Sequence, residues 1–230
     1  MRYALADTVF EIDTLLQATH QLLEDYRTDA PADYRIVTDR ADLEAERANA
    51  EEKRFSDAYY ETLAVQRKVS HALLEKDVLL FHGSAISMDG DGYIFAAPSG
   101  TGKSTHTRLW RERYGGRVAM VNDDKPFLKI ADSGAAIYGS PWDGKHRLSS
   151  NISVPLKAIA ILARAKENRI ERIDPSAALT ALMQQSYREE DIAGIFPLIL
   201  KLAELVPVYA LRCNMAVSAA ETAYKGMRGQ

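Results

Sequence analysis

One segment limits the fold of this chain more than any other, because an apolar run leads directly into a glycine-rich turn and then into a helical pattern. The run Tyr93–Ala97 predicts a strand and His106–Arg113 predicts a helix. The order of strand, Gly-x-Gly-Lys-Ser and helix is that of a phosphate-binding loop, G-x-x-x-x-G-K-[ST], with Ala97 in place of the first glycine. This replacement is mild if Ala97 keeps a negative φ.

The loop residues have the chemistry that a bound phosphate requires. Gly100 and Gly102 allow successive backbone N–H groups to curl around an anion, at the positive end of the helix that begins near Lys103. Lys103 would reach the β- and γ-phosphates, and the Ser104 hydroxyl would bind Mg²⁺. The expected nucleotide-binding residues are Ser99, Gly100, Thr101, Gly102, Lys103, Ser104 and Thr105, with Thr105 also packing in the helix. The alternative, a loop that only turns a corner, is disfavoured by this order of elements.

Hairpin signals lie on both sides of this loop. The turn Asp89–Gly92 joins Ser84–Met88 to the strand before the loop, so these two strands should pair antiparallel. A second hairpin is predicted from Pro126–Ile130 and Ala135–Tyr138. Most phosphate-loop proteins have parallel sheets built from βαβ units. The fold class expected here is therefore α/β, with a mixed, largely antiparallel sheet flanked by helices.

Paired carboxylates follow the next apolar run. Arg117–Val121 predicts a strand that ends in Asn122, Asp123 and Asp124. Adjacent side chains at a strand end differ in direction, so one carboxylate could hold a metal ion while the other faces an attacking hydroxyl. The simpler alternative is a solvated Asp-Asp turn.

The regions outside this centre are interpreted as structural. Residues 1–75 are expected to form a small N-terminal β/α region, and residues 76–230 the phosphate-loop domain. The N-terminal elements are strands in Tyr3–Ile12 and Tyr34–Thr38, a charged and solvated run Asp39–Arg54, and a helix Phe55–Glu75. The later elements are strands Leu156–Ala163, Arg169–Ile173 and Val206–Leu211, and helices Ser176–Ser186, 190–204 with a bend near Pro197, and Met215–Met227. The Met and aromatic residues of this last part are assigned to the core.

Composition excludes several classes of protein. Twenty-nine Lys and Arg against 32 Asp and Glu give a formal charge of −3, which argues against a nucleic-acid binder. Neither a membrane-spanning run nor a signal peptide is apparent, and we expect a cytoplasmic protein that does not act on membranes. Cys213 is the one cysteine, interpreted as a buried structural thiol in a reducing compartment.

These motifs together resemble the catalytic domain of HPr kinase/phosphorylase. His82-Gly83, the hairpin, the phosphate loop, Asp123-Asp124 and Gly139-Ser140-Pro141-Trp142 occur in the same order, over about residues 78–165. The chain looks like one of the shorter HPr-kinase-related proteins, some of which accompany ribosomal peptide biosynthesis. Phosphoenolpyruvate carboxykinase is similar in fold, but more remotely.

The resemblance implies roles for individual residues. Lys103 and Ser104 would handle the triphosphate and Mg²⁺, Asp123 would be the general base, and Asp124 a metal ligand, although the division between the two carboxylates stays open. His82, otherwise a strand-end histidine, would orient the acceptor hydroxyl or the γ-phosphoryl group.

The chain also departs from this family. Tyr138–Lys145 replaces the acidic-Arg-Gly loop of HPr kinase, with Asp143 or Lys145 as candidate substitutes. A segment that would dock HPr is not evident, so a different peptide or a small-molecule hydroxyl is the expected acceptor.

The resulting expectation is an ATP- and Mg²⁺-dependent kinase acting on a hydroxyl, with serine of a peptide or protein, such as a ribosomal peptide precursor, as the favoured acceptor. A carboxykinase acting on a small acid is disfavoured, because the chain is short and shows no extra Lys/His metal pair. A nucleotide-binding scaffold without catalysis is the remaining alternative. Whether the chain forms a homo-oligomer stays open.

Overall fold

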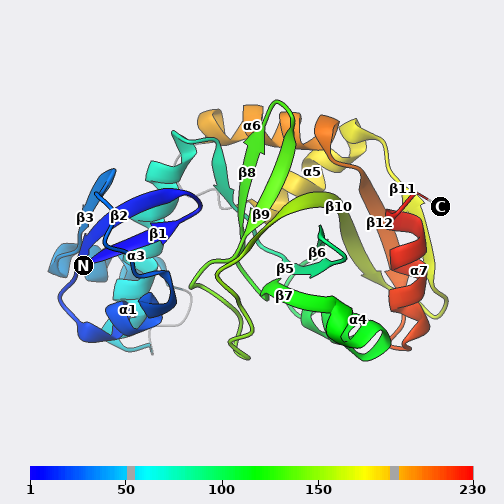
Figure 1. Ribbon diagram of the computed structural model, residues 1–230, viewed down its shortest axis with the longest axis horizontal. Helices are drawn as coiled ribbons and strands as arrows, with labels where there is room; N and C mark the ends of the chain where they lie inside the picture. The colour runs from blue at the N-terminus through cyan, green and yellow to red at the C-terminus, as the bar shows by residue number, and fades with distance from the viewer. Residues whose placement is uncertain (51–54, 187–191, 230) are drawn as a thin grey trace. The chain divides into compact units, whose positions relative to one another are not determined.

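The computed structural model describes residues 1–50, 55–186 and 192–229, and the chain divides into two compact units, Met1–Lys76 and Asp77–Gln230 (Figure 1). The last four residues of the charged run, 51–54, and the first two of the helix predicted at 190–204 lie outside the described residues.

The N-terminal unit contains a three-stranded sheet in the order β1-β2-β3. Its strands are β1 (Arg2–Leu5), β2 (Thr8–Asp13) and β3 (Tyr34–Val37), with β1 antiparallel and β3 parallel to β2. The run predicted as Tyr3–Ile12 is thus two strands. Ala6 and Asp7 connect them with φ values of +48° and +61°, and neither residue type signals such a turn as strongly as Gly or Asn would.

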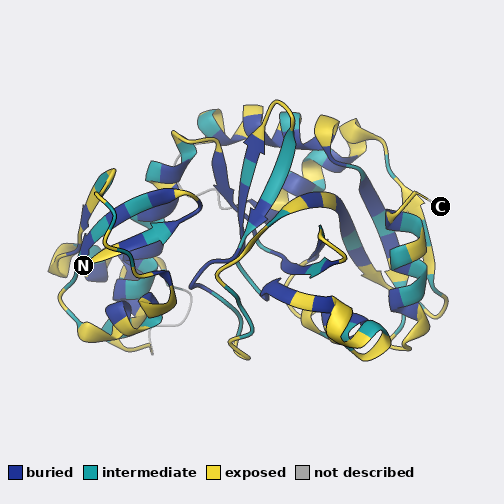
Figure 2. Cartoon of the chain, in the orientation of Figure 1, coloured by how far each residue is buried: buried dark blue, intermediate teal, exposed yellow. Residues whose placement is uncertain are grey.

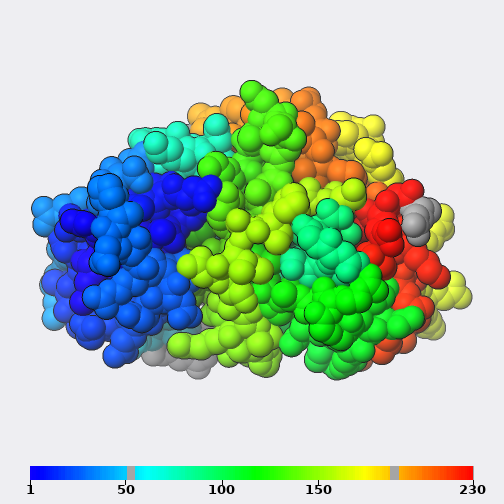
Figure 3. All heavy atoms as spheres, viewed as in Figure 1, coloured from blue at the N-terminus to red at the C-terminus, as the bar shows by residue number. Residues whose placement is uncertain are grey.

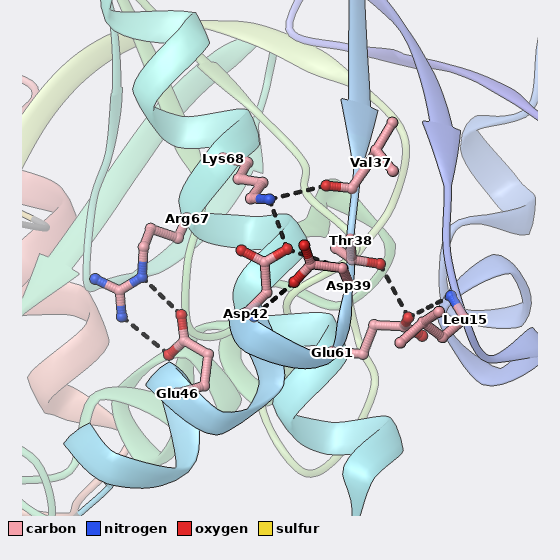
Figure 4. A network of polar contacts seen from close by, with 9 residues as sticks. All are labelled: Leu15, Val37, Thr38, Asp39, Asp42, Glu46, Glu61, Arg67 and Lys68. Carbon is pink, nitrogen blue, oxygen red and sulfur yellow. Dashed lines mark hydrogen bonds and ion pairs between the residues drawn. The ribbon is translucent and has the colours of Figure 1, made fainter.

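Helices complete this unit, and a network of buried polar side chains holds them. The helical elements are α1 (Gln17–Leu22), the 3₁₀ turn η1 (Glu24–Tyr26), α2 (Arg40–Asn49) and α3 (Asp57–Leu74). Glu61 of α3 is fully buried and accepts hydrogen bonds from Leu15 N at 2.6 Å and from Thr38 Oγ1 at 3.0 Å (Figure 4). Glu46 is only 6% exposed and pairs with Arg67 at 2.6 Å, so the charged run is not simply a solvated face.

The C-terminal unit contains a nine-stranded sheet. Its main path has the order β4-β8-β9-β10-β6-β5-β7, and β12 continues from β10 to β11. The strands are β4 (Val78–Leu80), β5 (Ser84–Met88), β6 (Asp91–Ala96), β7 (Val118–Asn122), β8 (Phe127–Ala131), β9 (Gly134–Tyr138), β10 (Ser153–Arg164), β11 (Arg169–Arg172) and β12 (Val208–Cys213). Both expected hairpins, β5–β6 and β8–β9, are antiparallel. The mixed, largely antiparallel sheet is therefore confirmed.

Strand β10 joins the two halves of this sheet. Its first residues pair antiparallel with β9, whereas its later residues pair parallel with both β6 and β12. Three parallel strands, β6, β10 and β12, consequently end at the same edge. Strand β6 is the one that enters the glycine-rich loop before α4, so this edge is where a ligand is expected.

Helices cover both faces of the sheet. They are α4 (Lys103–Tyr114), the turn η2 (Gly115–Arg117), α5 (Pro175–Gln185), α6 (Ile192–Leu205) and α7 (Ser218–Met227). Alternate strand residues such as Tyr93, Phe95 and Ala160 share one core cluster with Trp110 of α4 and Ala223 of α7. Figures 1 and 2 show α5 and α6 on the face of the sheet opposite to α4 and α7, with their outer surfaces exposed.

Of two helices predicted in the C-terminal part, the first begins as expected and the last does not. Helix α5 begins as predicted, with the Asp174 side chain accepting from Ser176 N and Pro175 in the first turn. Helix α7 begins at Ser218, later than predicted, and Met215 before it is 79% exposed. The assignment of Met215 to the core is therefore wrong.

Candidate active site

The loop after β6 has the backbone that its glycines predict. The hairpin turn leads into β6 through Asp89 and Gly90, whose φ values are +55° and +89°. Ala97 follows the strand, is buried and keeps a negative φ, so the missing glycine leaves the path of the backbone intact. Gly100 and Gly102 have φ values of +76° and +125°, which side-chain-bearing residues rarely adopt.

Helix α4 begins immediately after this loop. Gly102 is its N-cap residue and has no side chain with which to cap the first turn. The amide groups of the first turn and the helix dipole can therefore interact with an anion instead. Ser104 lies in this turn and is exposed, as a hydroxyl that meets a metal–phosphate group must be.

Lys103 is anchored at the base of the loop. Its side chain is buried, and Nζ donates to the Ala97 carbonyl at 2.9 Å. Burial lowers the pKa of Lys103, and the nearby charges of Asp124 and Asp123 partly offset this effect. The lysine thus lies within electrostatic reach of both carboxylates that follow β7.

Gln185, at the end of α5, holds the same carbonyl. With its amide nitrogen facing two carbonyl groups, it donates to Ala97 O at 3.1 Å and to His82 O at 3.2 Å. The backbone carbonyl of Gln185 accepts from His82 N at 2.6 Å. Gln185 therefore connects Ala97, at the base of the glycine-rich loop, to the segment that contains His82 through hydrogen bonds. The sequence contains no signal for this contact, because its partners are far apart along the chain.

Asn122 directs the chain after β7. Its Oδ1 accepts from Asp124 N at 2.8 Å and from Lys125 N at 2.6 Å, which closes an Asx turn. Its Nδ2 donates to Ser140 O at 3.0 Å. Strand β5 lies between β7 and the loop strand β6, so the carboxylates come from the second strand away and not from the neighbouring one.

Asp123 is almost fully enclosed. Its side chain is 4% exposed, and Oδ1 accepts from Ser84 Oγ at 2.6 Å. Ser84 Oγ in turn lies 3.1 Å from Thr107 Oγ1, which donates to Ser104 O at 3.2 Å. Hydroxyl groups from β5 and α4 therefore link Asp123 to the first turn after the loop. Sequence reasoning missed Ser84 and Thr107.

Asp124 is more accessible and pairs with His82. The distance from His82 Nε2 to Asp124 Oδ1 is 3.4 Å, and about a third of each side chain is exposed. Burial alone would raise the pKa of Asp124, but the His82 hydrogen bond and the charges of Lys125 and Lys103 together lower it. Asp124 consequently stays ionised at neutral pH.

The loop after β9 lies against this pair of carboxylates. A Cβ at Gly144 would come within 3.2 Å of Asp123 Oδ2, so the loop backbone passes close to that oxygen. Trp142 is buried and packs edge-on against Phe127 at 6.1 Å. Asp143 accepts from Ser149 Oγ at 3.0 Å, within its own loop, whereas Lys145 is exposed.

The oxygen groups at this site suit Mg²⁺ that arrives with a nucleotide. Ser104, Asp123 and Asp124 supply one hydroxyl and two carboxylates. Among residues 1–50, 55–186 and 192–229, no group of three or more His, Cys, Asp or Glu could hold a metal ion. Mg²⁺ typically binds through one or two carboxylates plus substrate phosphates, and this set of donors fits that pattern.

The structure thus brings most of the predicted residues into one connected arrangement. Lys103, His82 and Asp124 are joined through Ala97 and Gln185, and Asp123 is joined to α4 through Ser84. Ser99, Gly100 and Thr101 lie in the exposed or half-exposed part of the loop. Thr105 lies on the other side of α4, where it lines a separate cavity.

Comparisons with known proteins give matches of two kinds, one to solved structures and one to a protein family. A solved structure, the Hpr(Ser) kinase/phosphatase from Coxiella burnetii, is similar at 10% sequence identity with a TM-score of 0.38, covering 65% of this chain and 93% of that chain. A search of curated proteins finds no match. In the part of the chain that the structure describes, no helix has the length and apolar character needed to span a membrane.

The second match is to a family and covers most of the chain. The model of the family described as SynChlorMet cassette protein ScmC matches residues 53–223, which include the loop, both carboxylates, His82 and Gln185. The chain therefore belongs to the SynChlorMet cassette protein ScmC family.

Proposed function

We propose that this protein is an ATP- and Mg²⁺-dependent kinase that transfers the γ-phosphoryl group to a hydroxyl acceptor, with serine of a peptide or protein as the acceptor. One observation carries the proposal: Ala97 O accepts from both Lys103 and Gln185, and Gln185 also holds His82 beside Asp124. Lys103, the proposed phosphate-binding group, and the ionised carboxylate of Asp124 thus belong to one hydrogen-bonded arrangement. Phosphoryl transfer depends mainly on such positioning and on charge neutralisation.

The proposed reaction assigns a task to each group. The amides of Gly100 and Gly102 and the Lys103 ammonium bind the phosphates. The acceptor oxygen attacks the γ-phosphorus, the bond from that phosphorus to the bridging oxygen breaks, and ADP leaves with the bridging oxygen. The hydroxyl proton passes to the Asp123 carboxylate. Mg²⁺, when bound, neutralises phosphate charge, and Ser104 and Asp124 would hold it.

The two carboxylates suit different tasks because their surroundings differ. The pKa of Asp124 is lowered, mainly by His82 once the opposing effect of burial is overcome, so Asp124 is a poor base and a good metal ligand. Asp123 has one oxygen bonded to Ser84, which leaves Oδ2, beside Gly144, for the acceptor proton. This contrast supports Asp123 as the base.

The test is incubation with ATP, Mg²⁺ and peptides encoded beside the gene, with phosphate addition followed by mass spectrometry. We expect one added phosphoryl group on a serine. Asp123→Asn should abolish transfer while ATP binding, measured by calorimetry, changes little. The matched control is Asp132→Asn, at an exposed position whose side chain contacts Lys201. Full transfer by Asp123→Asn would overturn the assignment of the base.

A nucleotide-binding scaffold is the second candidate, favoured by the burial of Asp123 at 4% exposure. It predicts ATP binding without transfer to any of the peptides. Incubation with oxaloacetate and ATP tests the carboxykinase alternative directly.

A further inference from the structure

A cavity of about 460 Å³ lies on the side of the phosphate loop away from the carboxylates, next to α4. Its lining residues come from the loop, from α4, and from the ends of β10 and β12: Gly100, Thr101, Gly102, Thr105, His106, Leu109, Leu162, Ala163, Arg164, Ala165, Cys213, Asn214 and Met215. Its volume falls within the range of roughly 300 to 1,000 Å³ that is usual for small-molecule sites.

The position of this cavity follows from the sheet. Strands β6, β10 and β12 are parallel, and the loop and the cavity both lie where these strands end. A molecule whose phosphates occupy Gly100–Gly102 would therefore have the cavity immediately beside it. Helices α4 and α7 lie side by side (Figure 3), and Arg113 in the last turn of α4, at the helix end away from the loop, forms an ion pair with Glu221.

The wall formed by α4 is uncharged. His106 is 2% exposed, and burial lowers its pKa to about 4. Its Nε2 accepts from Trp110 Nε1 at 3.1 Å, so the proton of the neutral ring lies on Nδ1, which is 4.0 Å from Cys213 Sγ. With Leu109 and Leu162, this neutral imidazole gives an apolar surface.

The rim contains the exposed apolar side chain of Met215 and the hydrogen-bonded guanidinium of Arg164. Met215 is 79% exposed, and a thioether at the mouth of an apolar cavity can pack on an aromatic ring. Arg164 keeps its positive charge but is held in place, because its guanidinium donates to Thr101 O at 3.1 Å and to Gly100 O. The same contacts brace the wall that the cavity shares with the loop.

We propose that this cavity binds the aromatic base of the nucleotide whose phosphates lie on Gly100–Gly102. The inference rests on the proposed function, since it takes a nucleoside triphosphate to be the ligand of the loop. A cavity with an apolar wall and one guanidinium on its rim, opening beside a phosphate site, suits a planar aromatic base, which can stack on both kinds of surface. Burial of the base gives ATP an affinity that its phosphates alone do not provide.

The experiment compares ATP with tripolyphosphate, which has the phosphates but no base, by calorimetry on the full chain. For the unchanged protein we expect ATP to bind at least tenfold more tightly. Ala163→Phe adds a ring at an exposed lining position and should weaken ATP binding at least tenfold, with tripolyphosphate affinity changed less than twofold. Ala177→Phe, an exposed position on α5 outside the cavity, is the matched control and should leave both affinities unchanged.

Met215→Ala is the second variant, because Met215 is exposed and its truncation should not disturb folding. It should weaken ATP binding severalfold and leave tripolyphosphate binding unchanged. Equal affinities of the unchanged protein for ATP and tripolyphosphate, or equal losses for both ligands in these variants, would overturn the cavity as the base site while leaving the phosphate loop in place. Failure of both ligands to bind the unchanged protein would overturn the proposed kinase function as well.

Discussion

Gln185 has more influence on the candidate site than its position at the end of a helix suggests. Its side-chain amide donates to Ala97 O and His82 O, and its backbone carbonyl accepts from His82 N at 2.6 Å. A buried carbonyl that loses its donor costs about 1–3 kcal/mol, because it has also been removed from water. The link between Ala97, which Lys103 also contacts, and the His82 segment therefore depends on the amide side chain of Gln185.

Gln185→Met keeps the length of the side chain and removes its two amide hydrogen bonds, to Ala97 O and His82 O, whereas the backbone bond from His82 N remains. We expect the free energy of unfolding to fall by about 1–3 kcal/mol and the affinity for ATP to weaken, because Ala97 O is then held by Lys103 alone. Urea unfolding followed by tryptophan fluorescence and calorimetry with ATP measure the two effects. Gln184→Met, at the exposed neighbouring position, is the control. Equal free energies of unfolding and equal ATP affinities in the two variants would show that the Gln185 amide does not position Ala97 and His82.

His106 makes the stability of the C-terminal unit depend on pH. Its pKa in the folded protein is about 4, lowered by burial, whereas an ordinary histidine in the unfolded chain titrates near 6.5. The unfolded state therefore binds the proton first as the pH falls. The stabilising contribution is complete above about pH 6.5 and is lost as the pH falls to about 4, and it amounts to roughly 3 kcal/mol.

The measurement is the free energy of unfolding at pH 7 and at pH 4, compared between the unchanged protein and His106→Gln. The variant should be less stable at pH 7, because the bond from Trp110 is altered, but it should lose less stability on acidification. His71→Gln, an exposed position on α3, should follow the unchanged protein. Identical pH dependence in His106→Gln and the unchanged protein would contradict the burial of a neutral imidazole.

At the scale of elements, α3 organises the N-terminal unit through one carboxylate. Glu61 accepts from Leu15 N, Leu16 N, Thr19 Oγ1 and Thr38 Oγ1, so it joins α3 to the start of α1 and to the end of β3. A hydrogen bond to a charged group contributes about 1.5–3 kcal/mol. These contacts come from segments separated along the chain, and the helix alone could not hold them together.

Glu61→Leu should therefore lower the stability of residues 1–76 by roughly 3 kcal/mol or more, since several buried donors lose their acceptor. Hydrogen exchange resolved by residue measures this loss, with the largest increases expected around Leu15 and Thr38. Glu44→Leu, on an α2 side chain that is 67% exposed, is the matched control and should change exchange little. Unchanged protection from hydrogen exchange in Glu61→Leu would show that this carboxylate does not hold these segments together.

The elements that sequence reasoning predicted are those with a local signal. The Asp89-Gly90 turn fixes the β5–β6 hairpin, and Gly102 with Lys103 fixes the start of α4, because each conformation depends on residues next to one another. The turn at Ala6 and Asp7 was missed because Ala rarely adopts a positive φ and a single Asp is a weaker signal for this turn than Gly or Asn. Local pattern therefore predicts the loop, but not every break in a strand.

The contacts that complete the site lacked such a signal. Ser84 reaches Asp123 across two paired strands, and Gln185 reaches Ala97 from a helix on the other side of the sheet. Strand β10 pairs antiparallel at one end and parallel at the other, a division that its apolar pattern does not encode. Tertiary pairing decides these contacts, so they become visible only in the folded chain.

For the whole molecule, the proposed catalytic and nucleotide-binding groups all belong to one of the two units. The loop, Asp123, Asp124, His82 and the strands that hold them lie in Asp77–Gln230. The nine-stranded sheet draws all of its strands from the same unit. Nucleotide binding should therefore need only this unit, and a contribution of residues 1–76 to acceptor recognition is a hypothesis that a fragment can test.

This division predicts that a fragment of residues 77–230 folds and binds ATP with an affinity within twofold of the full chain. Calorimetry measures the affinity, and circular dichroism shows whether the fragment is folded. Phosphate transfer to the peptide, followed by mass spectrometry, should fall much more than ATP affinity, because the fragment retains the reacting groups but lacks the rest of the chain. A folded fragment whose ATP affinity drops more than tenfold would show that residues 1–76 contribute to the nucleotide site. Peptide phosphorylation by the fragment at the level of the full chain would instead show that residues 1–76 are not needed for acceptor recognition.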